Sequence, residues 1–125
     1  MIELFWEEFG LLRKMTGSVT ANEWNMSDEA TQAHERIDTL RYVIHDCSGV
    51  SDFIVPQDEI DFIAIRASVA LRQNPRIKIA FVSSHSIVRK LIDTFNQMDR
   101  SLHRCCRFDT LEEARQFVGN PVRLT

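Results

Sequence analysis

Two groups of polar side chains stand directly after apolar segments, where a chain can place chemistry. Residues 40–49 read Leu-Arg-Tyr-Val-Ile-His-Asp-Cys-Ser-Gly, an apolar strand core with a polar exit that ends in glycine. That exit presents Asp46 and Ser48, and Ser51 follows shortly after. Parallel sheets usually bind ligands at the carboxyl ends of their strands, so this segment predicts one half of a binding rim.

The second polar group follows the apolar segment 76–83 and consists of Ser83, Ser84, His85 and Ser86. A helix is expected to begin here, and a helix N-terminus offers free N–H groups and a partial positive charge to a small anion. His85 could add a proton or a charge near neutral pH. The alternative is a plain N-cap with solvated neighbours, because serine is a favoured cap without any ligand.

Catalysis by these residues would need a nucleophile, a base and an acid in one place. A triad can be drawn from Ser48 or Ser84, His45 or His85, and Asp46. However, the Gly-x-Ser-x-Gly elbow that exposes such a serine does not occur in the sequence, and spacing alone does not supply the geometry. We predict that the protein is not an enzyme, with an enzyme acting on a small anionic substrate as an alternative.

Two histidine–cysteine pairs could in principle supply metal ligands. His45 and Cys47 stand two residues apart on an expected strand, as do His103 and Cys105, so each pair points to one face. Zinc would need all four to converge tetrahedrally, but the spacing is not that of a zinc finger. Because free cysteine often behaves as a small core residue, we predict buried structural cysteines, no metal site and no cofactor.

An apolar trio, Phe53, Ile54 and Val55, stands where a loop is expected. With Trp6 and Trp24 it could line a pocket or patch for a small hydrophobic ligand, a lipid tail or a partner protein. The alternative is that these residues close the base of the core, because most aromatic residues in a small domain are packing. The predicted ligand- or partner-binding rim comprises Asp46, Ser48, Ser51, Phe53, Ile54, Val55, Ser83, Ser84 and His85.

Hydrophobic periodicity places these residues on an α/β fold. The expected strands are 2–7, 11–15, 40–46, 76–83 and 103–108, of which the first two form an antiparallel hairpin. Four helices are expected to open near Thr20, Gln57, Ser84 and Thr110, and Thr20 with Glu23 and Thr110 with Glu113 fit the capping box. Strands alternating with helices imply a mostly parallel sheet with right-handed crossovers. We predict a loop at 48–56, one domain over residues 1–119 and a loose tail at 120–125.

Composition bounds the class of protein and its compartment. The 125 residues are 44% hydrophobic and 26% charged, which is ordinary for one globular domain. A net charge of −3 with scattered basic residues argues against nucleic-acid binding. Three cysteines favour a reducing compartment, and neither a basic signal-peptide start nor an apolar run of about 18 residues occurs. We expect a cytoplasmic protein without a membrane span, and an apolar edge could form a homodimer.

Four parts of the sequence carry a resemblance to a known fold: the hairpin with residues 17–24, the strand segments 42–50 and 77–82, and the ending 108–117. Together they resemble the STAS-like fold of anti-sigma-factor antagonists and transporter STAS modules, most closely its SpoIIAA-like branch of small uncharacterised bacterial proteins. The resemblance covers nearly the whole chain and concerns fold more than chemistry. It implies a regulatory or binding module.

The sequence departs from the antagonists at the position that carries their regulation. There, the Asp-x-Ser-Gly-Val exit is followed by an Asp-Ser-Ser-Gly-type segment with a phosphorylated serine at a helix start. Asp46, Ser48 and the following Gly-Val match the exit, but the Asp-Ser positions fall on Ile54 and Val55. Without that serine, we predict a non-catalytic module that recognises a partner protein or small ligand, with a small hydrophobic-ligand or lipid carrier as an alternative.

Overall fold

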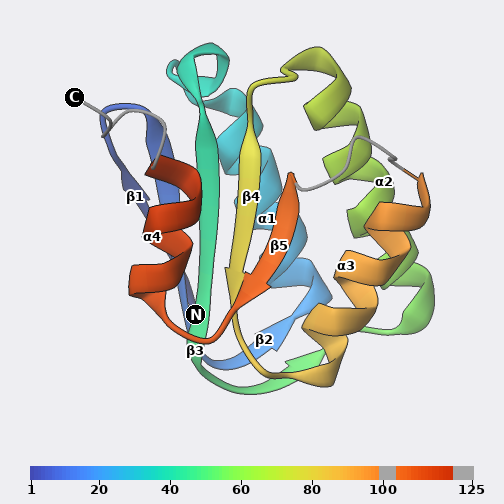
Figure 1. Ribbon diagram of the computed structural model, residues 1–125. Coiled ribbons are helices and arrows are strands. Elements are labelled where there is room, and N and C mark those ends of the chain that lie inside the picture. The colour runs from blue at the N-terminus through green and yellow to red at the C-terminus, as the bar shows by residue number, and fades with distance from the viewer. Residues whose placement is uncertain (99–103, 120–125) are drawn as a thin grey trace.

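The computed structural model describes residues 1–98 and 104–119, and these form one sheet with helices on both faces (Figure 1). In chain order the elements are β1 (Ile2–Trp6), β2 (Gly10–Thr20), α1 (Ala21–Ala33), the 3-10 helix η1 (Ile37–Thr39), β3 (Tyr42–Ile54), α2 (Gln57–Gln73), β4 (Lys78–Val82), α3 (Ser86–Met98), β5 (Cys105–Phe108) and α4 (Leu111–Gly119). His103 and the predicted tail at 120–125 lie outside the described residues.

The five strands of the sheet lie in the order β1-β2-β3-β4-β5. β1 pairs antiparallel with β2, and every other neighbouring pair is parallel. The α/β class, the mostly parallel sheet and the N-terminal hairpin are therefore confirmed. Because successive right-handed crossovers progress in one direction, α1, α2 and α3 cover the same face, and α4 covers the other (Figure 1).

Local sequence signals explain where two of the helices begin. The N–H of Glu23 donates to Thr20 Oγ1 at 3.1 Å, and the N–H of Thr20 donates back to Glu23 Oε1 at 3.2 Å. The same reciprocal pair joins Glu113 and Thr110 ahead of α4. Each pair satisfies two N–H groups near a helix start, so both predicted capping boxes are confirmed.

The prediction of a loop at 48–56 is wrong, because β3 continues to Ile54. Its second half pairs with β2 out to Thr20, beyond the end of β4, through two shifts of register. Gly49 permits this close pairing, since a Cβ there would lie 3.2 Å from the Met15 carbonyl oxygen. Serine and glycine looked like a turn in the sequence, but the long edge of β2 supplies hydrogen-bond partners that keep the segment extended.

The side chains of the sheet divide into two cores. Alternation along β3 turns Val43, His45 and Cys47 toward α1, α2 and α3, in the larger core. Ile44 faces α4 in a smaller core with Ala80, Val82, Ala114 and Val118. The larger core is therefore the one that three helices must cover, and the site described next lies within it.

Candidate functional site

A cavity of about 400 Å³ lies between α1, α2 and the face of the sheet that these helices cover. Small-molecule sites range over roughly 300–1,000 Å³, so the volume suits a small ligand. Its walls are mainly apolar, and they include Leu40, Val43, Ile79, Phe81, Leu91 and Phe95. Its ionisable lining includes Arg13, Asp28, His45 and Arg66.

The cavity exists because the two helices that wall it pack on different partners. α1 packs over β1 and β2, whereas α2 packs mainly along α3. On the side that faces the cavity, α2 carries Ala64, Ala67 and Ala70 among larger side chains such as Ile63 and Leu71. Each alanine contributes only a methyl group, so the space that a leucine or phenylalanine would fill stays open.

Arg13 places a positive charge at the cavity. Alternation along β2 turns Leu11, Arg13 and Met15 toward the helices, and all three are buried. Arg13 is only 3% exposed, and its Nη1 donates to Asp28 Oδ1 at 2.7 Å. Its guanidinium carbon lies 5.1 Å from the ring centroid of Trp24. Burial lowers the pKa of Arg13 and Asp28 opposes that shift, but an arginine stays charged in proteins.

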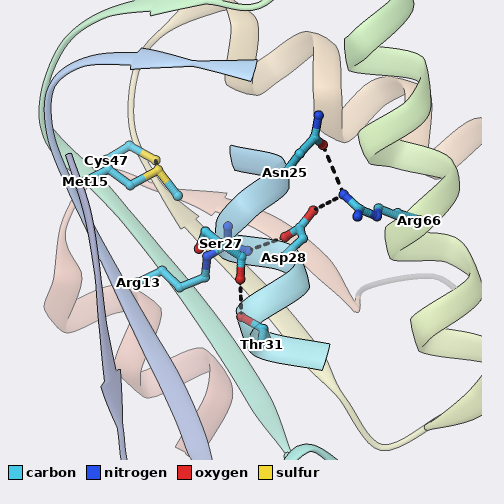
Figure 2. A network of polar contacts seen from close by, with 8 residues as sticks. All are labelled: Arg13, Met15, Asn25, Ser27, Asp28, Thr31, Cys47 and Arg66. Carbon is cyan, nitrogen blue, oxygen red and sulfur yellow. Dashed lines mark hydrogen bonds and ion pairs between the residues drawn. The ribbon is translucent and has the colours of Figure 1, made fainter. Parts of the chain in front are cut away.

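Asp28 links Arg13 to a second guanidinium on the facing helix (Figure 2). Its Oδ2 lies 3.5 Å from Arg66 Nη1, which also donates to Asn25 Oδ1 at 3.0 Å. Within the described part of the chain, Nε and Nη2 of Arg13 have no hydrogen-bond partner. These two nitrogens form the side-on edge of a guanidinium, so a complete bidentate edge of a buried cation is unused.

His45 lines the cavity beside Arg13, its register partner across β2 and β3. Its ring stacks between Trp24 at 5.2 Å and Phe81 at 4.5 Å, measured between ring centroids. Burial, helped by the positive charge of Arg13, holds the pKa of His45 well below its ordinary value. His45 is therefore neutral at pH 7, and its Nδ1 has no hydrogen-bond partner among residues 1–98 and 104–119.

The first polar group of the predicted rim is bonded within itself. Asp46 Oδ1 accepts from the Ser48 N–H at 3.1 Å and from Ser48 Oγ at 2.7 Å. Asp46 is buried, whereas Ser48 and Ser51 are exposed along the extended end of β3. Because side chains alternate along a strand, Asp46 points to the α4 face and His45 to the opposite face. An aspartate–histidine pair of a triad is therefore not assembled from these neighbours.

The second polar group caps α3. Ser83 Oγ accepts from the His85 N–H at 3.0 Å, and His85 Nδ1 accepts from the Ile87 N–H at 3.3 Å. Ser83 is buried, His85 is half-buried and Ser84 is exposed. These hydrogen bonds cap the start of the helix within its own chain.

The apolar trio joins the two polar groups without lining the cavity. Phe53 is buried, and its ring meets the ring of His85 edge-on with centroids 5.0 Å apart. Ile54 is 54% exposed, and Val55 is half-buried against the core. The structure thus brings both halves of the rim together, but a binding role for the rim stays a prediction.

Solved structures show which fold this arrangement belongs to. No protein-family model matches the sequence, and no curated protein matches it closely. The unphosphorylated form of the anti-sigma factor antagonist SpoIIAA is similar with a TM-score of 0.66 and 11% identity, covering 100% of each chain. The chain has a SpoIIAA-like fold. An uncharacterised Shewanella loihica protein of the DUF3478 family has a SpoIIAA-like fold and matches at a TM-score of 0.56 and 11% identity, covering 94% of this chain and 92% of that one.

In the part of this SpoIIAA-like domain that the structure describes, the cysteines belong to no metal-binding group. Burial raises the pKa of Cys47 to about 12 and that of Cys105 to about 12. Cys47 Sγ lies 3.7 Å from Met15 Sδ (Figure 2). Within residues 1–98 and 104–119, no group of three or more histidine, cysteine or acidic residues could hold a metal ion. No helix of the same residues is long and apolar enough to cross a bilayer.

Sequence reasoning missed the cavity and its charged lining in this SpoIIAA-like fold. One signal was present in the strand that contains Leu11, Arg13 and Met15, where a charged residue takes an inward position between two apolar ones. The other was the set of alanines at 64, 67 and 70 of α2, which line the cavity beside larger side chains such as Ile63. Neither signal predicts the separation between α1 and α2. The cavity depends on how these two helices pack, which only the tertiary structure shows.

Proposed function

We propose that this SpoIIAA-like domain is a non-catalytic binding module that holds a small, mostly apolar ligand in the cavity between α1 and α2. The cavity carries the proposal, because about 400 Å³ of mainly apolar space lies inside the larger core. Burying a ligand's apolar surface there would contribute about 25 cal/mol per Å². The rim supports ligand binding less well, since Asp46, Ser83 and His85 accept bonds from their own chain.

The chemistry of the lining supports binding without catalysis. Cys105 lines the cavity, but its pKa of about 12 keeps it a protonated thiol, which is a poor nucleophile. His45 is neutral and turned away from Asp46, so it lacks the carboxylate partner that orients a catalytic base. We therefore favour binding over an enzyme acting on a small anionic substrate.

Recognition of a partner protein at the rim is a second candidate. Ile54 is 54% exposed at the end of β3, and Ser51 is exposed earlier on the same strand. Burying this apolar side chain in a protein contact would be favourable. SpoIIAA is itself described as an anti-sigma factor antagonist, which makes a protein partner a reasonable expectation for a related fold.

Titration with the neutral apolar dye N-phenyl-1-naphthylamine tests the cavity proposal. The folded protein should bind one dye molecule and enhance its fluorescence. Ala67→Leu adds three carbons inside the cavity and so takes space from the dye. Because burial of each CH₂ group contributes about 0.8 kcal/mol, the variant should bind the dye at least about tenfold more weakly. An unchanged dye affinity in Ala67→Leu, or no saturable binding by the wild type, would refute the proposal.

Two control variants make the result specific. Ala30→Leu adds the same atoms to an exposed position of α1 and should bind the dye like the wild type. Ile54→Asp alters the exposed end of β3 and should also leave dye binding unchanged. If Ile54→Asp instead abolishes dye binding while Ala67→Leu preserves it, the rim rather than the cavity holds the dye.

A further inference from the structure

The buried polar side-chain atoms that lack hydrogen-bond partners gather beside the cavity. Among the described residues they are Nε and Nη2 of Arg13, Oγ of Ser27 and Nδ1 of His45. They come from β2, α1 and β3. Arg13 and His45 are register partners that line the cavity, and Ser27 precedes the aspartate that binds Arg13. Buried polar groups are normally satisfied, so such a cluster marks a place where acceptor atoms are missing.

The charges around the cavity do not balance. Arg13 and Arg66 line it with two positive charges, and Asp28 supplies one negative charge. His45 lies beside them as a neutral ring. The lining therefore carries a net charge of 2 − 1 = +1, counted over these four ionisable residues. Arg13 and Asp28 balance each other, and the excess charge belongs to Arg66, whose side chain is 29% exposed; a ligand with one negative charge would neutralise the lining.

The free edge of Arg13 has a particular shape. Nη1 is engaged by Asp28 at 2.7 Å, so the side-on edge formed by Nε and Nη2 remains. Two parallel N–H donors on a planar fork match the two oxygens of a carboxylate. The guanidinium carbon lies 5.1 Å from the ring centroid of Trp24, a cation–π contact that helps to hold the guanidinium in place.

Building on the proposed function, we infer that the ligand is an amphipathic carboxylate whose apolar part fills the cavity, and that the Arg13 side chain turns its free edge, which is closed to solvent in this structure, toward the charged end of the ligand. A carboxylate fits better than a phosphate monoester, because the latter carries about −1.5 to −2 charges at neutral pH and would exceed the single positive excess. The apolar part contacts the side chains of α2, α3 and the sheet that form the walls.

Calorimetric titration of the wild type with decanoate and with 1-decanol tests the inference, since the two ligands share a chain and differ in charge. Hydrogen bonds to a charged group predict a preference for decanoate of at least about tenfold. An aromatic pair, 2-naphthylacetate and 2-naphthaleneethanol, shows whether the apolar part is a chain or a ring. Preference for the acid in either pair supports the inference, and equal affinity within both pairs overturns it.

Two substitutions should move the preference in opposite directions. Arg13→Met removes the fork and keeps the bulk, so it should abolish the preference for the acid and preserve alcohol binding. Asp28→Asn removes the competing carboxylate, so it should strengthen acid binding and leave alcohol binding unchanged. General damage to the fold would weaken both members of a pair, which separates it from the predicted pattern.

The outcomes also separate this inference from the proposed function. If the wild type binds the dye and both alcohols as well as both acids, the cavity binds ligands but Arg13 does not select their charge. If neither the dye nor any of the four compounds binds, the proposed function and this inference both fail. A preference for acids that persists in Arg13→Met overturns the assignment to Arg13 alone.

Discussion

The buried His45 should make the protein lose stability in mild acid. Its ring is packed between Trp24 and Phe81, and burial and the charge of Arg13 hold its pKa well below the ordinary value. In the unfolded chain, the same histidine has a pKa of about 6.5 and binds a proton below that pH. The folded state does not bind that proton, so acid stabilises the unfolded state selectively.

The size of the loss follows from proton linkage. Above about pH 6.5 neither state is protonated at His45, and its contribution to the free energy of unfolding is constant. Below that pH the free energy of unfolding falls by at most about 1.4 kcal/mol per pH unit, which amounts to at most about 2 kcal/mol between pH 7 and pH 5. A typical domain has only about 5–15 kcal/mol in total, so the change is readily measured.

His45→Phe should remove this loss while keeping a ring in the stack. It also removes the unpartnered Nδ1, whose burial costs about 1–3 kcal/mol, so the variant should be at least as stable as the wild type at pH 7. Urea unfolding followed by tryptophan fluorescence, at about pH 7, 6 and 5, gives the free energies needed. The control His34→Gln removes a half-buried histidine that stacks on Trp6, and it should keep the wild-type loss.

A flat free energy of unfolding between pH 7 and pH 5 in the wild type would refute this reasoning. It would mean that His45 accepts a proton in the folded state, as a ring hydrated through the cavity could do. An equal loss in His45→Phe would also refute it, by assigning the acid sensitivity to other groups. Measurements stop near pH 5 because carboxylates begin to titrate below it.

Two further predictions concern groups outside the cavity. Glu7 accepts from both terminal nitrogens of Arg115, at 2.8 and 2.6 Å, and this pairing lowers the pKa of Glu7. Because the pair is partly exposed, Arg115→Met should lower the free energy of unfolding by about 1 kcal/mol or less at pH 7. The difference between variant and wild type should vanish as acid protonates Glu7. An equal difference at about pH 2 would contradict this. In thiol labelling of the folded protein, the half-buried Cys106 should react before Cys47 and Cys105, whose pKa values are raised to about 12. Mass mapping of the labelled peptides checks the order, and earlier labelling of Cys47 would contradict it.

Much of the fold was predictable because its signals are local. The capping boxes at Thr20 and Thr110 depend on residues three positions apart, and the buried runs at 43–44 and 79–82 depend on consecutive apolar residues. These patterns, with the alternation of strands and helices, were enough to predict a mostly parallel sheet and a resemblance to the SpoIIAA-like fold, which the solved structures confirm.

Only part of the predicted rim is formed by contacts between residues that are neighbours in the sequence. The caps made by Ser83 and His85 involve neighbours in sequence, so the polar start of this helix was visible in the sequence. The extension of β3 to Ile54 was missed, because it depends on hydrogen bonds to the distant end of β2. Such pairing decides between a turn and a strand for a segment as polar as Ser48-Gly49.

The sequence by itself determined the order of the elements and the two faces of each strand, because side-chain alternation and helical periodicity are properties of the chain. It also placed Arg13 in an inward position among apolar residues. Only the tertiary structure decided that α1 and α2 pack on different partners and leave a cavity between them. The reason is physical: a cavity is the space that neither helix fills, and the meeting of Arg13, Asp28 and His45 beside it depends on contacts between β2, α1 and β3 that no single segment encodes.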